Sequence, residues 1–408
     1  MMYWFLANAQ LKGRMSPTAA DTPRRLLYVV NEDFAFLLNR LPMARAAREA
    51  GFEVHVATNV NNGAKAIEAE GFILHAIPFR RGGLSPFVII PTLLAIRRLE
   101  KSIQPSIVHH SGLQCCVYGA MASFGENLPM VNAITGLGSV FTSASWRTRL
   151  LRRGMMWLLP WLLNRKRSCI LVQNPDDRAA MSALRIKPDQ LTLIPGSGVD
   201  TDALTPLPEP EGPMTVGFAG RLLVDKGIRA LVAAHDILRQ QGHEFNLIIA
   251  GNPDPANPTS VSPDEVEQWA RRPGITWLGH IDDIASLWQR CHLAVLPSHR
   301  EGLPGSLMEA AACGRPLIAT DVPGCREIAL DDQTGLLVPV ENPAALAQAI
   351  VRLAASPQLR KRYGEAARRL VVDRLSAKII GNLIVELYDE LTQGSPRADS
   401  RLPNGEAS

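Results

Sequence analysis

The sequence predicts an α/β protein of two doubly wound, Rossmann-like domains, each with a parallel sheet covered by helices. Apolar runs that suit strands alternate with amphipathic runs that suit helices along most of the chain. This alternation is typical of β-α-β units, whose strands are parallel and buried on both faces. The chain has 408 residues, too many for one ordinary core, and a proline-rich segment at 206–213 separates two such series. Because such sheets bind ligands beyond the carboxyl ends of their strands, we expect the site in a central cleft between the domains.

The first series begins with an apolar strand at 24–30, a helix at 37–51 and a strand at 52–58. Further strand and helix signals alternate through "NGAKAIEAEG", "FILHAIP", "PTLLAIRRLEKS", "PSIVHHS", "PMVNAIT" and "CILVQN". We therefore expect an N-terminal domain over residues 24–205.

The second series predicts a C-terminal domain over residues 206–375. It runs from the strand "MTVGFAG" through "FNLIIAG", "GITWLG", "LAVLPS" and "RPLIAT", with helical segments between them. A final helix at 376–392 is expected to pack back on the N-terminal domain, and residues 1–23 and 393–408 are expected to be a disordered leader and tail.

Composition favours a globular protein, with 46% hydrophobic and 20% charged residues. The six cysteines lack the spacing of metal ligands, so we interpret them as reduced thiols of a cytosolic protein. The longest apolar runs are half of the about 20 residues that a membrane-spanning helix needs, and no such helix is expected.

Positive charge is concentrated in the first half of the chain. Residues 1–200 hold 23 Lys and Arg against 13 Asp and Glu, although the net charge of the whole chain is only +4. This excess indicates an anionic partner, which could be lipid, phosphate or nucleic acid. Nucleic acid fits less well, because the basic residues are interleaved with Leu and Trp and do not form stacking platforms on exposed strands.

The segment "GFAGRLLVDKG" places two cations, Arg221 and Lys226, directly after a predicted strand, flanked by Gly220 and Gly227. Cations beside glycines that permit close backbone approach suit a diphosphate. A pair of solvated surface charges explains this segment equally well.

A second candidate site follows the strand "LAVLPS", which ends at Ser298. The loop "HREGLPG" leads into a helix from about Ser306, with Gly314 as its stop signal. The helix N-terminus offers unpaired N–H groups to a phosphate. Glu301 in the loop and Glu309 in the helix would meet different parts of one ligand, and carboxylates accept hydrogen bonds from the vicinal hydroxyls of sugars.

The apolar neighbours of Glu309 indicate that its helix is buried. A buried carboxylate without a donor costs several kcal/mol, which favours a ligand group such as a ribose over a solvated helix residue.

These segments are familiar in combination. "GRLLVDKG", "WLGHIDD", "LPSHREGLPGSLMEAAACGRPLIATDVPGCREI" and "TGLLVPV" resemble the retaining glycosyltransferases of family 4, which have the GT-B fold. Glu301 and Glu309 match that family's E-x7-E motif. The segments "NEDFAFLLNRLPMARAAREAGFEVHVAT", "PFRRGGLSP", "NAITGLGSVF" and "LVQNPDDR" are similar to the subgroup that builds capsular, O-antigen and exopolysaccharide repeat units on undecaprenyl diphosphate. The resemblance spans residues 24–392.

The resemblance implies a retaining, metal-independent transfer of a hexose or N-acetylhexosamine from a UDP-sugar to a lipid-linked saccharide, without a cofactor. The catalytic residues would be Glu301, Arg221 and Lys226. The donor would also contact Gly220, His280, Ile281, Gly302, Leu303, Pro304, Gly305 and Glu309, with residues 279–281 beside the base. The N-terminal domain would bind the acceptor, with Asn31, Thr135, Gly136 and Gly138 on the acceptor side.

Two features bear on how far the resemblance carries over. Many relatives have a histidine where this chain has Thr135, and His109 or His110 could replace it only by coincidence of position. The D-x-D sequence that begins at Asp200 lies beside the linker rather than after a strand, so we interpret it as capping and turn chemistry and not as a metal site.

The segment at 146–168 suggests membrane contact. It holds seven basic residues around three tryptophans and several leucines. Basic ends around an aromatic and aliphatic middle are typical of a segment at a membrane interface. An ordinary core helix is the alternative, but the expected lipid-linked acceptor favours peripheral attachment to the anionic inner face of the cytoplasmic membrane.

Other functions remain open at this point. A UDP-N-acetylglucosamine 2-epimerase-like isomerase would use the same two domains, and a non-catalytic nucleotide-sugar binding protein would need the same donor contacts. A glycosidase needs both carboxylates beside one bond, whereas one is expected here at the ribose. The sequence does not specify the donor sugar, the acceptor sugar or the linkage.

Overall fold

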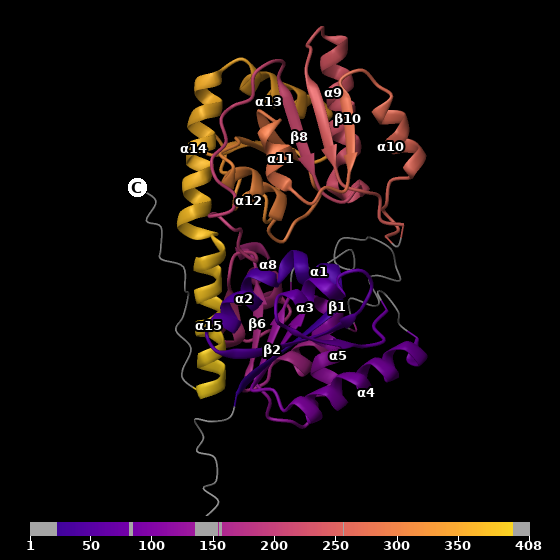
Figure 1. The fold of residues 1–408 in the computed structure, drawn as a ribbon, viewed down its shortest axis with the longest axis vertical. Helices are drawn as coiled ribbons and strands as arrows, with labels where there is room; N and C mark the ends of the chain where they lie inside the picture. The colour runs from indigo at the N-terminus through magenta and orange to yellow at the C-terminus, as the bar shows by residue number, and fades with distance from the viewer. Residues whose placement is uncertain (1–22, 81–84, 135–153, 155–156, 256, 395–408) are drawn as a thin grey trace, which may run out of the picture.

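The computed structural model describes residues 23–80, 85–134, 154, 157–255 and 257–394. Two α/β domains follow one another, each with a parallel sheet between helices (Figure 1). The predicted fold class is therefore confirmed.

The N-terminal sheet has seven strands among the described residues, in the order β3-β2-β1-β4-β5-β6-β7, and every neighbouring pair is parallel. The strands are β1 Arg24–Glu32, β2 Phe52–Asn59, β3 Ile73–Ala76, β4 Ile107–Ser111, β5 Met130–Ala133, β6 Ser168–Val172 and β7 Leu191–Leu193. β1 and β4 are central and wholly or largely buried, as parallel strands between two helix layers must be.

Helices cover both faces of this sheet. They are α1 Asp33–Asn39, α2 Leu41–Glu49, α3 Ala64–Ala69, α4 Pro86–Ile103, α5 Leu113–Ala122, α8 Pro175–Ala183 and the short 3₁₀ helix Pro188–Gln190. Residues 157–163 are also helical.

Two predicted helix bounds were wrong. The single helix expected at 37–51 is divided into α1 and α2 at Arg40, whose φ of −130° is not helical. Pro42 lies in the first turn of α2, where its missing N–H leaves no intrahelical bond unmade, so a new helix begins there. α4 starts at Pro86, and Pro91, where the segment "PTLLAIRRLEKS" begins, lies inside the helix.

The C-terminal sheet has six strands among the described residues, in the order β10-β9-β8-β11-β12-β13. They are β8 Thr215–Ala219, β9 Asn246–Ala250, β10 Ile275–Gly279, β11 Leu293–Leu296, β12 Leu317–Thr320 and β13 Gly335–Val338. The helices are α9 Ile228–Gln240, α10 Pro263–Ala270, α11 Ile284–Gln289, α12 Gly305–Ala312 and α13 Pro343–Ala354, with a 3₁₀ turn at Val224–Lys226.

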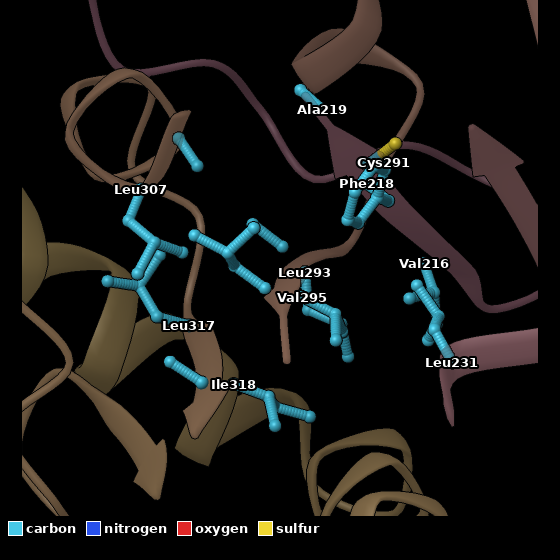
Figure 2. Close-up of a cluster of buried hydrophobic side chains, with 14 of the residues drawn as sticks. Val216, Phe218, Ala219, Leu231, Cys291, Leu293, Val295, Leu307, Leu317 and Ile318 are labelled. Carbon is cyan, nitrogen blue, oxygen red and sulfur yellow. The ribbon is translucent and has the colours of Figure 1, made fainter. Parts of the chain in front are cut away.

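Apolar side chains of the central strands form the core of this domain. Phe218 of β8, Leu293 of β11 and Leu317 of β12 are fully buried, and Leu231 of α9 and Leu307 of α12 belong to the same cluster (Figure 2). This core fixes the positions of the strand ends and helix starts that carry the candidate site.

Two long helices end the described chain. α14 Pro357–Arg374 runs along the C-terminal domain, and α15 Ala377–Gln393 continues along the N-terminal domain (Figure 1). α15 packs on α2, where Gly381 lies so close to Ala46 that an added Cβ would be 2.6 Å from the Ala46 Cβ. The Tyr388 hydroxyl is 2.6 Å from His109 Nδ1, so the last helix is part of the N-terminal core.

Arginines bind the interdomain linker to the C-terminal domain. Arg368 donates to the carbonyls of Thr201 and Leu204, and Arg315 donates to the Pro208 carbonyl at 2.7 Å. A cavity of 510 Å³ lies beside these contacts and includes none of the predicted site residues.

All six cysteines are buried and free of disulfides. Within the part of the chain that the structure describes, no helix has both the length and the apolar character that crossing a membrane requires.

Candidate functional site

The turn after β8 lies against the end of β11 because Gly227 lacks a side chain. Gly227 has a φ of +71°, and a Cβ there would lie 1.9 Å from the Pro297 carbonyl oxygen. This contact brings Lys226, the last residue of the 3₁₀ turn, beside the 299–305 loop that follows β11.

Lys226 and Glu301 form an ion pair at this point. Lys226 Nζ is 2.5 Å from Glu301 Oε1, and the side chain of Glu301 is 10% exposed. The Ser298 hydroxyl donates to the same carboxylate oxygen at 2.6 Å. Two predicted catalytic residues are thus in direct contact, which the sequence did not indicate.

Arg221 lies on the same sheet edge and is more exposed. Its Nη1 is 2.8 Å from Asp254 Oδ2, in the loop after β9. Gly251 allows these loops to meet, because a Cβ there would lie 1.9 Å from the Gly220 carbonyl oxygen. Each predicted cation therefore has a carboxylate neighbour, yet an ammonium has three N–H donors and a guanidinium has five, which leaves donors for an anion.

Helix α12 begins within the 299–305 loop and points its N-terminus toward it. Its N-cap is Pro304, and no described side chain caps it. The first N–H groups of a helix have no partner inside the helix, so these amides are available to an acceptor. The helix ends at Ala312, followed by Gly314 with a φ of +72°, which confirms the predicted stop signal.

Glu309 lies one turn into α12, between buried Met308 and Ala310. Burial raises the pKa of its carboxyl to about 7. Within the described residues no hydrogen bond or ion pair to this carboxylate is found. The predicted unpartnered carboxylate is therefore present, but the residue is partly exposed rather than fully buried, although its helix lies in the core.

The end of β10 carries the residues expected beside the base. Gly279 accepts a hydrogen bond from the Gly251 N–H at 2.6 Å, which joins this strand end to that of β9. His280 is exposed, and Ile281 is partly buried against the core.

Part of the predicted acceptor side is described. Asn31 lies near the carboxyl end of β1 and is half-buried. α1 follows on the side of the N-terminal domain that is turned toward the C-terminal domain (Figure 1), and its Phe34 and Leu38 are 44% and 68% exposed. Thr135, Gly136 and Gly138 lie outside the described residues.

The idea that His109 or His110 replaces the histidine of relatives is wrong. Both side chains are completely buried, because β4 is covered on both faces. His110 Nδ1 is 2.9 Å from Asn132 Oδ1, and burial lowers the pKa of His110 to about 4. Both histidines belong to the core.

Asp200 performs the predicted turn chemistry. Its Oδ1 accepts hydrogen bonds from the N–H groups of Asp202 at 3.1 Å and Ala203 at 2.9 Å. The described ranges hold no group of three His, Cys, Asp or Glu side chains arranged to bind a metal ion.

Several neighbours of the site were not predicted. Ser298 contacts Glu301, and Asp254 contacts Arg221. From the other domain, Asp177 of α8 and the N-cap residue Asn174 contact the 299–305 loop. In "NPDD", an Asn three residues before an Asp is a helix-cap signal, but no local pattern indicates the domain that the cap faces.

Comparison with known proteins identifies the family. A family model described as "Glycosyl transferase 4-like" matches residues 25–174, and one described as "Glycosyl transferases group 1" matches residues 213–356. The chain belongs to the family 4 glycosyltransferases, which have the GT-B fold.

Among curated relatives, N,N'-diacetylbacillosaminyl-diphospho-undecaprenol alpha-1,3-N-acetylgalactosaminyltransferase of Campylobacter jejuni is 24% identical over 364 residues, covering 86% of this chain and 95% of the relative. The capsular polysaccharide biosynthesis glycosyltransferase CapM of Staphylococcus aureus is 22% identical, covering 85% of this chain and 92% of the relative. The structure of Anabaena Alr3699/HepE in complex with UDP and glucose superposes with a TM-score of 0.73 at 17% identity, covering 89% of this chain and 99% of that one.

The contact at Gly227 gives a testable stability difference. Gly227→Ala must displace either the 3₁₀ turn or the end of β11, whereas Gly242→Ala has the same unfavourable positive φ but open space around the new Cβ. We expect Gly227→Ala to lower the free energy of unfolding by about 1–3 kcal/mol more than Gly242→Ala. Urea unfolding of both variants measures this, and equal losses would show that the close approach does not exist.

Proposed function

We propose that this protein is a retaining glycosyltransferase that moves a hexose or N-acetylhexosamine from a UDP-sugar to a saccharide on undecaprenyl diphosphate. The observation that carries the donor half of the proposal is the grouping of Lys226, Glu301 and the uncapped N-terminus of α12 at one sheet edge. The acceptor half is supported by the Campylobacter jejuni relative, whose name specifies a diphospho-undecaprenol substrate.

Each donor group has a proposed partner. The diphosphate is bound by Arg221, Lys226 and the first amides of α12, which offer positive charge and directed N–H groups. Glu301 binds the transferred sugar through the carboxylate oxygen that Lys226 and Ser298 leave free. Glu309 accepts hydrogen bonds from the ribose hydroxyls, and residues 279–281 border the base. The complex of Alr3699/HepE with UDP and glucose supports a uridine nucleotide.

In the proposed reaction, the acceptor hydroxyl oxygen bonds to the anomeric carbon from the face on which the diphosphate leaves. The bond between that carbon and the β-phosphate oxygen breaks, and the hydroxyl proton passes to a β-phosphate oxygen. UDP is released, and the anomeric carbon of the transferred sugar keeps its configuration. Negative charge grows on the departing diphosphate, and Arg221, Lys226 and the α12 amides stabilise it where they stand, without rearranging. These groups supply the charge stabilisation without a metal ion in this proposal.

The N-terminal domain is assigned to the acceptor. Asn31 lies near the end of β1, directly before α1, and α1 lies on the side turned toward the donor domain (Figure 1). The exposed Phe34 of α1 offers an apolar surface there. Thr135, Gly136 and Gly138 belong to the same proposed acceptor region. In this proposal the acceptor domain comprises residues 24–205 with the final helix, and the donor domain comprises residues 206–375.

We further propose peripheral attachment to the inner face of the cytoplasmic membrane through the N-terminal domain. Trp157 and Trp161 are 76% and 62% exposed, and Trp161 stacks on Phe124 with ring centroids 5.2 Å apart. Phe87 at the start of α4 is 91% exposed. Exposed aromatic side chains beside basic residues suit the headgroup region of an anionic bilayer.

The activity test incubates the purified protein with a panel of UDP-sugars and a membrane extract and measures labelled lipid, with and without a chelator. Lys226→Ala and Glu309→Ala are each expected to abolish transfer while the far-UV circular dichroism stays unchanged, because each removes a donor contact. Full activity in either variant would refute the donor-site assignment. Loss of activity with chelator would refute metal independence, and a new sugar nucleotide formed without acceptor would indicate an isomerase.

Donor affinity should depend on pH through Glu309. Burial raises the pKa of this carboxyl to about 7, and ribose hydroxyls favour its charged form. At pH values below that pKa, the Glu309 carboxyl must lose its proton before the donor binds. The affinity for the donor therefore rises with pH. Between about pH 6 and pH 8, calorimetry should show UDP-sugar binding tighten by up to about tenfold. Glu309→Gln should bind equally at both pH values, and a dependence that persists in this variant would exclude Glu309 as its source.

Membrane attachment is tested by sedimentation with vesicles that contain about 30% anionic lipid. The Trp157→Ala/Trp161→Ala double variant should lose most vesicle binding. Trp277→Ala is the control outside the proposed surface, because Trp277 lies on β10 of the C-terminal domain and donates there to the Gly251 carbonyl. Equal binding of the double variant and the unaltered protein would contradict this surface.

A further inference from the structure

The 299–305 loop is held from the opposite domain on both sides of Glu301. Arg300 Nη2 is 2.7 Å from Asp177 Oδ1, and Asn174 Nδ2 donates to the Gly302 carbonyl at 2.7 Å. Asn174 and Asp177 stand at the start of α8 in the N-terminal domain. The two residues that flank Glu301 therefore each have a partner in the other domain.

The start of α8 is built to present these two side chains. Asn174 Oδ1 accepts from the Asp177 N–H at 2.7 Å, which is an N-cap bond, and the Asn174 amide nitrogen is 3.0 Å from Asp177 Oδ2. The cap therefore turns the amide group toward the other domain. Asp177 is 1% exposed, so its charge has little water to stabilise it and depends on Arg300.

The bond to Gly302 also fixes the direction of one peptide group. The carbonyl and the following N–H of a trans peptide point in opposite directions, so a carbonyl held by Asn174 directs the Leu303 N–H away from α8. Gly324 makes room for this carbonyl, since a Cβ at Gly324 would lie 2.3 Å from its oxygen. Leu303 itself packs on Gly196 of the N-terminal domain.

We propose that Asn174, Asp177 and Arg300 form an interdomain lock that positions Glu301 and the loop amides for a nucleotide-sugar. These three are positioning residues, because they act on the donor through the 299–305 loop. The donor site is complete only while α8 touches the loop, so separation of the domains weakens donor binding. The identity of the ligand rests on the proposed function, whereas the lock itself rests on the contacts between the domains.

Two substitutions remove the interdomain contacts without removing the N-cap of α8. Asn174→Ser keeps a hydroxyl acceptor for the cap but is too short to reach Gly302. Arg300→Met keeps the length and apolar part of the side chain but removes the charge. The matched controls are Asn342→Ser, where Asn342 caps α13 through the Ala345 N–H at 3.0 Å, and Arg352→Met, where Arg352 pairs with Asp332 on the surface.

The test combines hydrogen exchange of the full-length protein with UDP-glucose binding by calorimetry. In Asn174→Ser and Arg300→Met we expect the amides of Gly302, Leu303, Gly305 and Ser306 to exchange at least about fivefold faster than in the unaltered protein without ligand. UDP-glucose should bind at least about fivefold more weakly, with neither change in the controls.

Unchanged exchange in both variants would overturn the lock, and so would faster exchange with binding unchanged within about twofold. The proposed donor site fails separately if Lys226→Ala retains UDP-glucose affinity. The exchange comparison still tests the lock in that case, because it needs no ligand.

Discussion

The close approach of the turn after β8 to the end of β11 is the constraint on which the candidate site depends. Gly227 permits it, since a side chain would occupy the space of the Pro297 carbonyl. The approach brings Lys226 to within 2.5 Å of Glu301 and places both beside the start of α12. A cation, a carboxylate and a helix N-terminus from separate parts of the chain thus meet at one sheet edge.

Two polar groups at this sheet edge lack a partner among the described residues. The α12 amides lack a capping side chain among the described residues, and Glu309 is a partly buried carboxylate without a partner there, whose pKa is raised by burial. An anionic diphosphate with a neighbouring diol satisfies both groups together, the first through its oxygens and the second through its hydroxyls. We therefore expect a nucleotide-sugar, which carries both the diphosphate and the diol, to bind more tightly than a ligand that carries only one of them.

Local sequence patterns predicted most of the fold, while the assignment of the donor-side residues stays a prediction. The alternating strands and helices, the stop at Gly314 and the turn role of Asp200 depend on short-range chemistry, and the structure confirms them. The break at Arg40 was missed although Pro42 marks it locally, whereas the burial of His109 and His110 was not predicted because it depends on the packing of α15 and the second helix layer. The pairing of Lys226 with Glu301, and of Asp177 with Arg300, joins segments far apart in the chain, which no spacing rule reveals.

In the proposed complex, the diphosphate of a nucleotide-sugar lies between Lys226, Arg221 and the N-terminus of α12. A crystal structure of the complex with UDP or a UDP-sugar tests it most directly. We expect phosphate oxygens within hydrogen-bond distance of Lys226 Nζ and of the first α12 amides, with the ribose at Glu309. Nucleotide density at any other place, or a ribose away from Glu309, would contradict it.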